Sequence, residues 1–158
     1  YPDRWRDLHA RPLRNEVMVV VCRAGHPLAA HEALRPADLA DQPLVGFDAS
    51  LPIADRIAQY LREHNVTPQL SHTFDNIDTI KTYLGHSDEA AILPYRAVRR
   101  EVEAGELAAV RLRPILRRPV TIVTDPAMRL SPTADAFIEA LLSTSPSAHS
   151  SEPETTTV

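Results

Sequence analysis

The chain has 158 residues, a formal net charge of −4, and 44 % hydrophobic but only 5 % aromatic residues. This length and apolar content suffice for one ordinary domain or for two small lobes. The chain lacks the basic excess typical of nucleic-acid-binding domains, and no apolar run reaches the ~18 residues of a membrane span. Its single cysteine, Cys22, excludes an intrachain disulfide and lies in an apolar run, so we expect a small buried hydrophobe.

Strands and helices are predicted to alternate along the chain. Short apolar, β-branched runs predict strands at 16–22, 43–47, 69–73, 90–93, 107–112 and 120–124. Helical periodicity predicts helices at 35–40, from 48–50 to about 64, at 77–84, at 95–104 and at 132–142. Residues 143–158 are rich in Ser, Thr, Pro and Glu and are expected to be disordered. The alternation favours an α/β fold with mostly parallel sheets.

Capping residues predict where several helices begin and end. Asp48-Ala49-Ser50 and Asp75-Asn76 offer side-chain oxygens to two helix starts. Ser131, followed by proline, predicts the start of the last helix. Gly105 suits the position after a helix C-terminus.

Three predicted strands end in polar or capping residues. The corners are Phe47-Asp48-Ala49-Ser50, Phe74-Asp75-Asn76 and Pro94-Tyr95-Arg96. If the strands are neighbours in one sheet, these corners converge on one cleft, because open α/β sheets bind ligands beyond the carboxyl ends of their strands. Ser50 and Asn76 could donate hydrogen bonds, and the Arg96 guanidinium could make a bidentate, charged contact, so an anionic small ligand would fit. The alternative is that each corner is only a helix cap.

Other candidate sites are weak. His26 and His31 lie across Pro27 with poor spacing for a shared metal, so we expect loop and surface histidines and predict neither metal nor cofactor. Asp75 and Asp78 are more simply a cap and a favourable charge at a helix start than a catalytic carboxylate pair. The chain contains no Gly-x-Ser-x-Gly elbow and no glycine-rich nucleotide signature.

Arginines cluster around two prolines late in the chain, at Arg111, Arg113, Arg117 and Arg118. This cluster could be a hinge or an interface segment. Contact with nucleic acid is the weaker alternative for a chain of this net charge.

Six segments carry a family resemblance. They are Val19–Ala29, Leu39–Val45, Phe74–Lys81, Ala91–Pro94, Glu101–Leu107 and Leu130–Pro132. In this order they resemble the effector-binding domain of LysR-type transcriptional regulators. The resemblance implies a type 2 periplasmic-binding-protein-like α/β fold with an effector between two lobes. Residues 1–41 would be part of lobe I, 42–117 a nearly complete lobe II, 118–142 the return to lobe I with the C-terminal helix, and 143–158 a disordered tail.

The same resemblance implies a function. The whole protein would be a cytoplasmic, homo-oligomeric, non-enzymatic regulator that binds DNA through a helix-turn-helix expected before residue 1. From the three corners we expect its effector contacts to be Ser50, Asn76 and Pro94, with Phe47, Asp48, Asp75, Tyr95 and Arg96 beside them. One departure is Ser87-Asp88-Glu89, where the family has a glycine-containing turn, so we expect a reshaped turn.

Two other classes stay open at this point. A solute receptor of an ABC importer shares the fold and would carry a secretory signal. An enzyme on this fold, such as a dehydratase, would need a catalytic acid or nucleophile in the cleft, and the sequence offers no convincing candidate.

Overall fold

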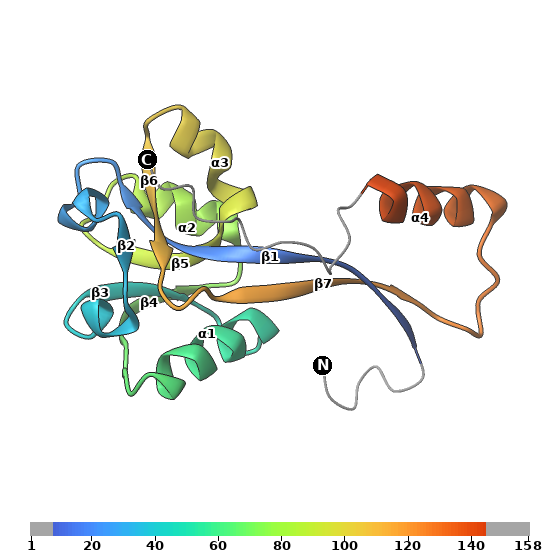
Figure 1. Cartoon of the computed structure of the whole chain (residues 1–158), viewed down its shortest axis with the longest axis horizontal. Coiled ribbons are helices and arrows are strands. Elements are labelled where there is room, and N and C mark those ends of the chain that lie inside the picture. Colours follow the sequence, from blue (N-terminus) through green and yellow to red (C-terminus); the bar gives the residue numbers. More distant parts are fainter. Residues whose placement is uncertain (1–7, 145–158) are drawn as a thin grey trace, which may run out of the picture. The chain divides into compact units, whose positions relative to one another are not determined.

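The computed structural model describes residues 8–144 (Figure 1). All but the first two residues of the predicted disordered tail, 143–158, lie outside the described residues. The chain divides into two compact units: Glu16–Arg118, and the flanking residues up to Asn15 and from Pro119 on.

A mixed β-sheet forms the core of the larger unit. Its strands are β1 (His9–Arg23), β2 (Ala33–Leu34), β3 (Pro43–Phe47), β4 (Gln69–Phe74), β5 (Ala90–Pro94), β6 (Leu107–Leu112) and β7 (Arg117–Thr124). The order is β2-β6-β1-β5-β3-β4, and β7 pairs with β1. β3 runs parallel to β4 and β5, whereas β1 lies antiparallel between β5 and β6. The α/β prediction is thus confirmed, but the sheet is mixed rather than mostly parallel.

Helices cover both faces of this sheet. They are α1 (Pro52–Glu63), α2 (Ile77–Leu84) and α3 (Tyr95–Glu103), with short 3₁₀ turns η1 (Pro27–Ala30) and η2 (Pro36–Leu39). Successive residues of a strand point to opposite faces. Accordingly Met18, Val20 and Cys22 pack into one core cluster, and Val19 and Val21 into the other.

The two clusters recruit different helices. Tyr60 and Leu61 of α1 join the first, whereas Ile80 and Leu84 of α2 and Val98 of α3 join the second. Figure 1 accordingly shows α1 on one side of the sheet and α2 with α3 on the other. Cys22 is fully buried, as predicted, and this burial raises the pKa of its thiol.

The helix boundaries test the capping predictions. Asn76 caps α2 and Gly105 has a positive φ of 74° after α3, as expected. The predicted cap at 48–50 is wrong: α1 begins at Pro52, after Leu51, which makes no side-chain capping bond. The reason is local, because the Asp48 carboxylate instead accepts a hydrogen bond from the Ser50 amide at 2.9 Å and forms a turn before the helix.

The larger unit begins at Glu16, within β1, and the assignment of residues to lobes stays a prediction. Residues 19–21 of β1 pair with the strands on either side, with Val20 opposite both Ile92 and Val110. A central strand cannot be separated from its sheet without losing both ladders. The apolar run that predicts this strand does not reveal which partners it pairs with.

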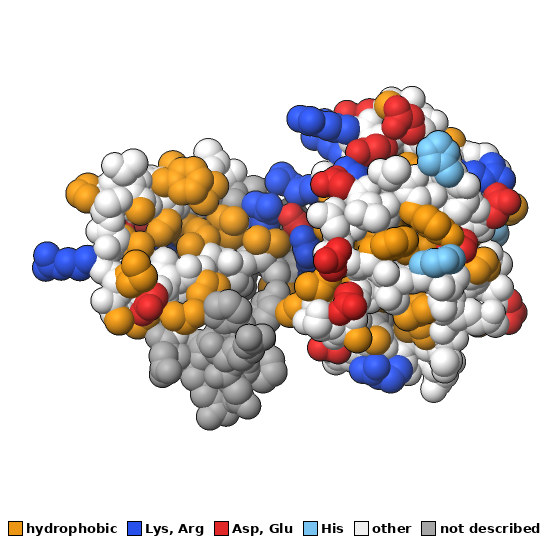
Figure 2. All heavy atoms as spheres, turned by 180° about the vertical axis from the view of Figure 1, so that it is seen from behind, with side chains coloured by type: hydrophobic (Ala, Val, Ile, Leu, Met, Phe, Trp, Pro, Cys, Tyr) orange, Lys and Arg blue, Asp and Glu red, His pale blue; other side chains and the backbone are white. Residues whose placement is uncertain are grey.

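The smaller unit contains α4 (Pro132–Thr144). The Ser131 hydroxyl accepts a hydrogen bond from the Ala134 amide at 3.2 Å, as the predicted cap requires. The apolar side chains of α4 include Ala134, Phe137, Ile138, Leu141 and Leu142. Only Ile138 of these is buried, and Phe137 is 63 % exposed. Figure 2 shows hydrophobic side chains gathered at the surface of this unit.

Candidate functional site

Three parallel strands end at one edge of the larger unit's sheet. β3 lies between β4 and β5 and runs parallel to both. Phe47 at the end of β3 is in register with Phe74 at the end of β4, and the next amide, Asp48 N, donates to Phe74 O at 2.9 Å. The strands are therefore neighbours, which is the condition for the predicted corners to converge.

The first corner leads from β3 into α1. Phe47 is buried, whereas Asp48 and Ser50 are exposed. Hydrogen bonds from the Ser50 side chain and backbone amide hold the pKa of Asp48 below its ordinary value. Asp48 therefore presents a carboxylate at this corner, already engaged with Ser50.

The second corner leads from β4 into α2. Asn76 Oδ1 accepts hydrogen bonds from the amides of Asp78 at 2.7 Å and Thr79 at 3.4 Å. Because this oxygen serves the cap, a hydrogen bond from the Asn76 side chain to a ligand would come from its amide nitrogen. Asp75 and Asn76 are both exposed, so this corner is open to solvent.

A short ion-pair network joins α2 to α3 behind the second corner. Lys81 Nζ lies 2.8 Å from both Asp78 Oδ1 and Glu101 Oε1, and donates to Ala97 O at 3.2 Å. The hydrogen bonds that Lys81 donates to Asp78 and Glu101 raise the pKa of Lys81, and the one that Glu101 accepts lowers the pKa of Glu101. The network fixes the relative position of the two helices that begin at the candidate site.

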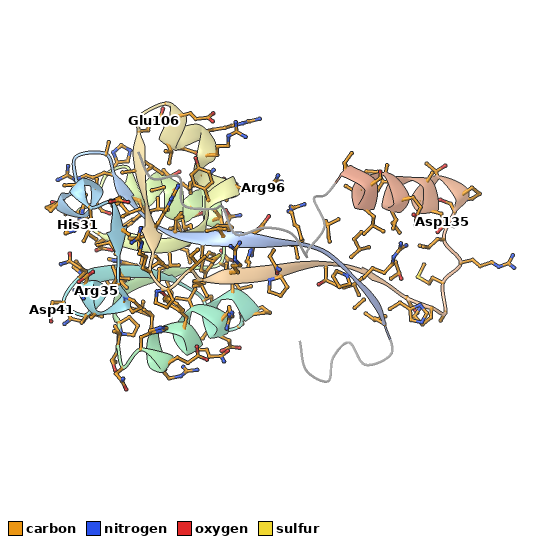
Figure 3. All side chains as sticks on the ribbon, viewed as in Figure 1. His31, Arg35, Asp41, Arg96, Glu106 and Asp135 are labelled. Atoms are coloured by element: carbon orange, nitrogen blue, oxygen red, sulfur yellow. The ribbon has the colours of Figure 1, made fainter. Side chains whose placement is uncertain are left out.

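The third corner leads from β5 into α3. Pro94 is buried and makes no side-chain capping bond. Tyr95 is 40 % exposed, and Arg96 is exposed on the first turn of α3, where Figure 3 labels it. Arg96 is thus the cationic side chain among the predicted contacts.

The geometry of this edge suits the binding of an anion. A helix follows each of the three strand ends, α3 directly, α2 after two residues and α1 after a four-residue turn, and helix N-termini present unpaired backbone N–H groups and a partial positive charge. Among residues 8–144, no group of His, Cys, Asp and Glu is arranged to hold a metal ion. The structure brings together the elements that carry all eight predicted contact residues, while their role toward a ligand stays a prediction.

Sequence reasoning missed a second set of interactions at the opposite edge of the sheet. Asp88 pairs with Arg23 at 2.6 Å, and its carbonyl oxygen lies 3.1 Å from His26 Nε2. His26 is only 6 % exposed, so the expectation of a surface histidine is wrong. Its Nδ1 accepts a hydrogen bond from the Leu28 amide, which explains the burial: the ring caps η1 and braces the 87–89 turn.

The 87–89 turn itself needs no unusual backbone. Among the described non-glycine residues only Asn65 has a positive φ. Glu89 is held by hydrogen bonds from Ser71 at 2.6 Å and Tyr83 at 3.2 Å. A hollow of about 590 Å³ beside Asp88 is lined by residues of several separate segments, including Arg23, His26, His31 and Gln42. Figure 3 places His31 and Arg96 at opposite ends of this unit.

Comparison with known proteins places the chain in a family. Residues 1–146 match the LysR substrate binding domain. The "SDS degradation transcriptional activation protein" of a Pseudomonas species is 34 % identical over 135 residues, covering 82 % of this chain and 43 % of the relative. The "RuBisCO operon transcriptional regulator" of Acidithiobacillus ferrooxidans is 24 % identical over 145 residues, covering 91 % and 47 %. The chain therefore spans less than half the length of these curated relatives.

Solved structures share the fold. The CcmR regulatory domain of Synechocystis, in complex with 2-PG, aligns with a TM-score of 0.80 and 18 % identity over 92 % of this chain and 70 % of that one. The effector-binding domain of QuiR, in complex with shikimate, aligns with a TM-score of 0.78 and 19 % identity over 90 % and 68 %. At such identities the likeness is one of fold, the type 2 periplasmic-binding-protein-like fold predicted from the sequence.

These comparisons do not support the alternative of an importer receptor. No described helix combines the length and the apolar character that crossing a bilayer requires. With nearly all of its length matched by the family and its fold shared with regulatory domains, the chain belongs to the LysR substrate-binding domain family.

Proposed function

We propose that this chain is the effector-sensing part of a LysR-type transcriptional regulator and binds a small anionic metabolite where β3, β4 and β5 end. The convergence of three helix N-termini on this one edge carries the proposal. The regulator acts without catalysis, in the cytoplasm, and contacts DNA through a helix-turn-helix domain outside this chain.

The charges at the edge favour a particular mode of binding. Asp48 and Asp75 are exposed carboxylates, which an anion would avoid. The anionic group is therefore expected nearest the start of α3, beside the Arg96 guanidinium, with the Asn76 amide nitrogen as a second donor. Ser50 and Tyr95 then contact neutral polar parts of the effector, and Phe47 and Pro94 form the apolar floor.

Regulation follows from the two-lobe architecture. We take the larger unit as lobe II, extended to Glu16, and the flanking segments as part of lobe I. An effector shifts the lobe angle only if it binds one arrangement more tightly than the other. That change reaches DNA through contacts between subunits.

Self-association is proposed to use the edge strand β4. β4 ends the sheet order, its residues Gln69 to Thr73 are all exposed, and Leu70 is 53 % exposed. An open strand edge presents backbone donors and acceptors that a second copy can pair with. Leu70→Lys should shift the full-length protein to smaller assemblies in light scattering, and an unchanged mass would contradict this interface.

The effector site is tested by binding to the full-length protein. A panel of small carboxylates and phosphates, including 2-PG and shikimate, is screened by calorimetry to find a ligand. Ser50→Ala and Asn76→Ala should each weaken that ligand by about 2- to 10-fold, the worth of one hydrogen bond. Arg96→Gln should weaken it more than the matched control Arg100→Gln on the last turn of α3. Unchanged affinity in both alanine variants would refute the site.

Reading the coding sequence upstream separates the regulator from the importer receptor. A helix-turn-helix is expected there, and a secretory signal would favour the receptor instead.

A further inference from the structure

The chain passes between its two compact units twice, at Asn15–Glu16 within β1 and at Arg118–Pro119 within β7. The residues of the larger unit at these two points form an ion pair. Arg118 Nη2 and Nε lie 2.9 and 3.1 Å from Glu16 Oε2. Glu16 is only 7 % exposed and the Arg118 side chain 31 %.

The segment that leads into Arg118 is anchored to the larger unit at successive residues. The Met18 amide donates to Leu116 O at 2.9 Å, and Leu116 is 1 % exposed. The Tyr60 hydroxyl donates to Pro114 O at 2.6 Å, and Arg56 Nε donates to Arg117 O at 3.4 Å.

Two of these anchors come from one face of α1. Arg56 and Tyr60 are four residues apart, a spacing that places helical side chains side by side. The start of α1 lies beside the first corner of the candidate site. Its middle, through Arg56 and Tyr60, is hydrogen-bonded to residues 114–117, which lead into the smaller unit. α1 therefore spans from the candidate effector edge to the point of exit.

A hydrogen-bonded ion pair that is largely shielded from solvent resists separation of its two partners more than an exposed pair does. Here the pair joins β1 to β7, which are neighbouring strands of the sheet. It opposes both sliding and separation of β1 and β7 at the boundary.

We propose that the Glu16–Arg118 pair, with Arg56 and Tyr60, clamps the exits of both connecting strands to α1. The larger unit then moves as one body with its effector corner, and changes in lobe angle are confined to the strands beyond Asn15 and Pro119. This deepens the proposed function, on whose lobe motion it rests. Its test uses no effector, so its failure is distinguishable from failure of the effector site.

Hydrogen exchange tests the α1 anchors on the full chain. Tyr60→Phe and Arg56→Gln should each speed exchange of the Ile115–Arg118 amides by about 5-fold, the equivalent of one net hydrogen bond. The matched controls are Tyr83→Phe, whose hydroxyl bonds Glu89, and Arg62→Gln, at the exposed end of α1. Equal exchange in variants and controls would overturn the role of α1.

Distance measurements between spin labels test the clamp itself. Labels at Arg100→Cys in α3 and Ala136→Cys in α4, in a Cys22→Ala background diluted with unlabelled chain, report the spread of distances between the units. Arg118→Met should broaden that distribution, and Arg118→Lys should broaden it less, because a lysine keeps the charge but not the two-pronged contact.

Arg113→Met is the matched control, since Arg113 lies in the same segment and pairs with the exposed Glu32 at 3.7 Å. An unchanged distribution in folded Arg118→Met would overturn the clamp. If Arg118→Met does not fold, the same decision rests on Arg118→Lys against Arg113→Met.

Discussion

Replacing Asn76 separates the structural role of a cap from a role in binding. α2 has only eight residues, so one lost cap affects the whole helix. Asn76 Oδ1 satisfies the Asp78 amide at 2.7 Å and more weakly the Thr79 amide at 3.4 Å. Replacement of such a cap by alanine costs about 0.5–2 kcal/mol, and because the second bond is long we expect about 1 kcal/mol for Asn76→Ala.

Asn76→Asp provides the contrast. Aspartate keeps the capping oxygen and adds a negative charge at the positive end of the helix, which contributes about 0.3–1 kcal/mol. The neighbouring Asp75 and Asp78 carboxylates oppose that charge, so we expect stability within about 0.5 kcal/mol of the parent. An anionic ligand should nevertheless bind Asn76→Asp less tightly than Asn76→Ala, because the added charge repels it.

The assay is hydrogen exchange of the α2 amides in the full chain, combined with urea unfolding. Ser131→Ala, which removes the cap of α4, is the control and should leave α2 exchange unchanged. Equal destabilisation by alanine and aspartate would refute the capping argument. Tighter binding of the anion to Asn76→Asp would refute the proposed place of its negative group.

Three further predictions concern the larger unit. Lys81→Met should cost about 1–2 kcal/mol near neutral pH. Because the pKa of Glu101 is lowered, this stabilisation is fully present above the ordinary glutamate pKa of 4.5 and is lost as pH falls through the lowered pKa. Because the pKa of Lys81 is raised, the stabilisation is fully present below 10.5 and is lost as pH rises through the raised pKa. Urea titrations at several pH values measure the stability difference between Lys81→Met and the parent, and a difference that persists in acid would contradict the prediction. Gly105→Ala should cost about 1 kcal/mol of stability and Gly105→Asn less, because φ is +74° and no atom crowds an added Cβ, so that the penalty is purely conformational. The thermal unfolding midpoint should fall in the order Gly, Asn, Ala. An unchanged midpoint in Gly105→Ala would contradict this reasoning. Cys22, buried and with a raised thiol pKa, should resist maleimide in the folded chain and react in urea, as mass spectrometry would show; rapid labelling without denaturant would contradict its burial.

Much of the local structure follows from the sequence because the relevant physics is local. Asn76 caps α2 through amides two and three residues away, and Gly105 adopts a backbone that other residues avoid. The fully buried strand from Ala90 to Pro94 is marked by its uninterrupted apolar run. The three strand-end corners could be predicted from the sequence for the same reason, since each is a short run of neighbouring residues.

Local signals fail where two of them compete. Asp48 and Ser50 both resemble helix caps, but Asp48 bonds to Ser50 and delays α1 to Pro52. Position in a pattern cannot decide which acceptor an amide selects. The sequence likewise predicts a loop position for His26. The residue is buried because its ring lies against the backbone carbonyl of Asp88, which is far away in the sequence.

By itself, the sequence determined the family, the succession of strands and helices, and the corners at which a ligand could bind. Only the tertiary structure decided that β1 runs antiparallel through the middle of the sheet, that the larger unit starts at Glu16, and that Glu16 meets Arg118 from 102 residues away. The physical reason is that strand pairing and ion pairs between distant segments depend on which surfaces become neighbours when the core closes. Hydrophobic patterning encodes which side of a strand is buried, but not the strand that will lie beside it.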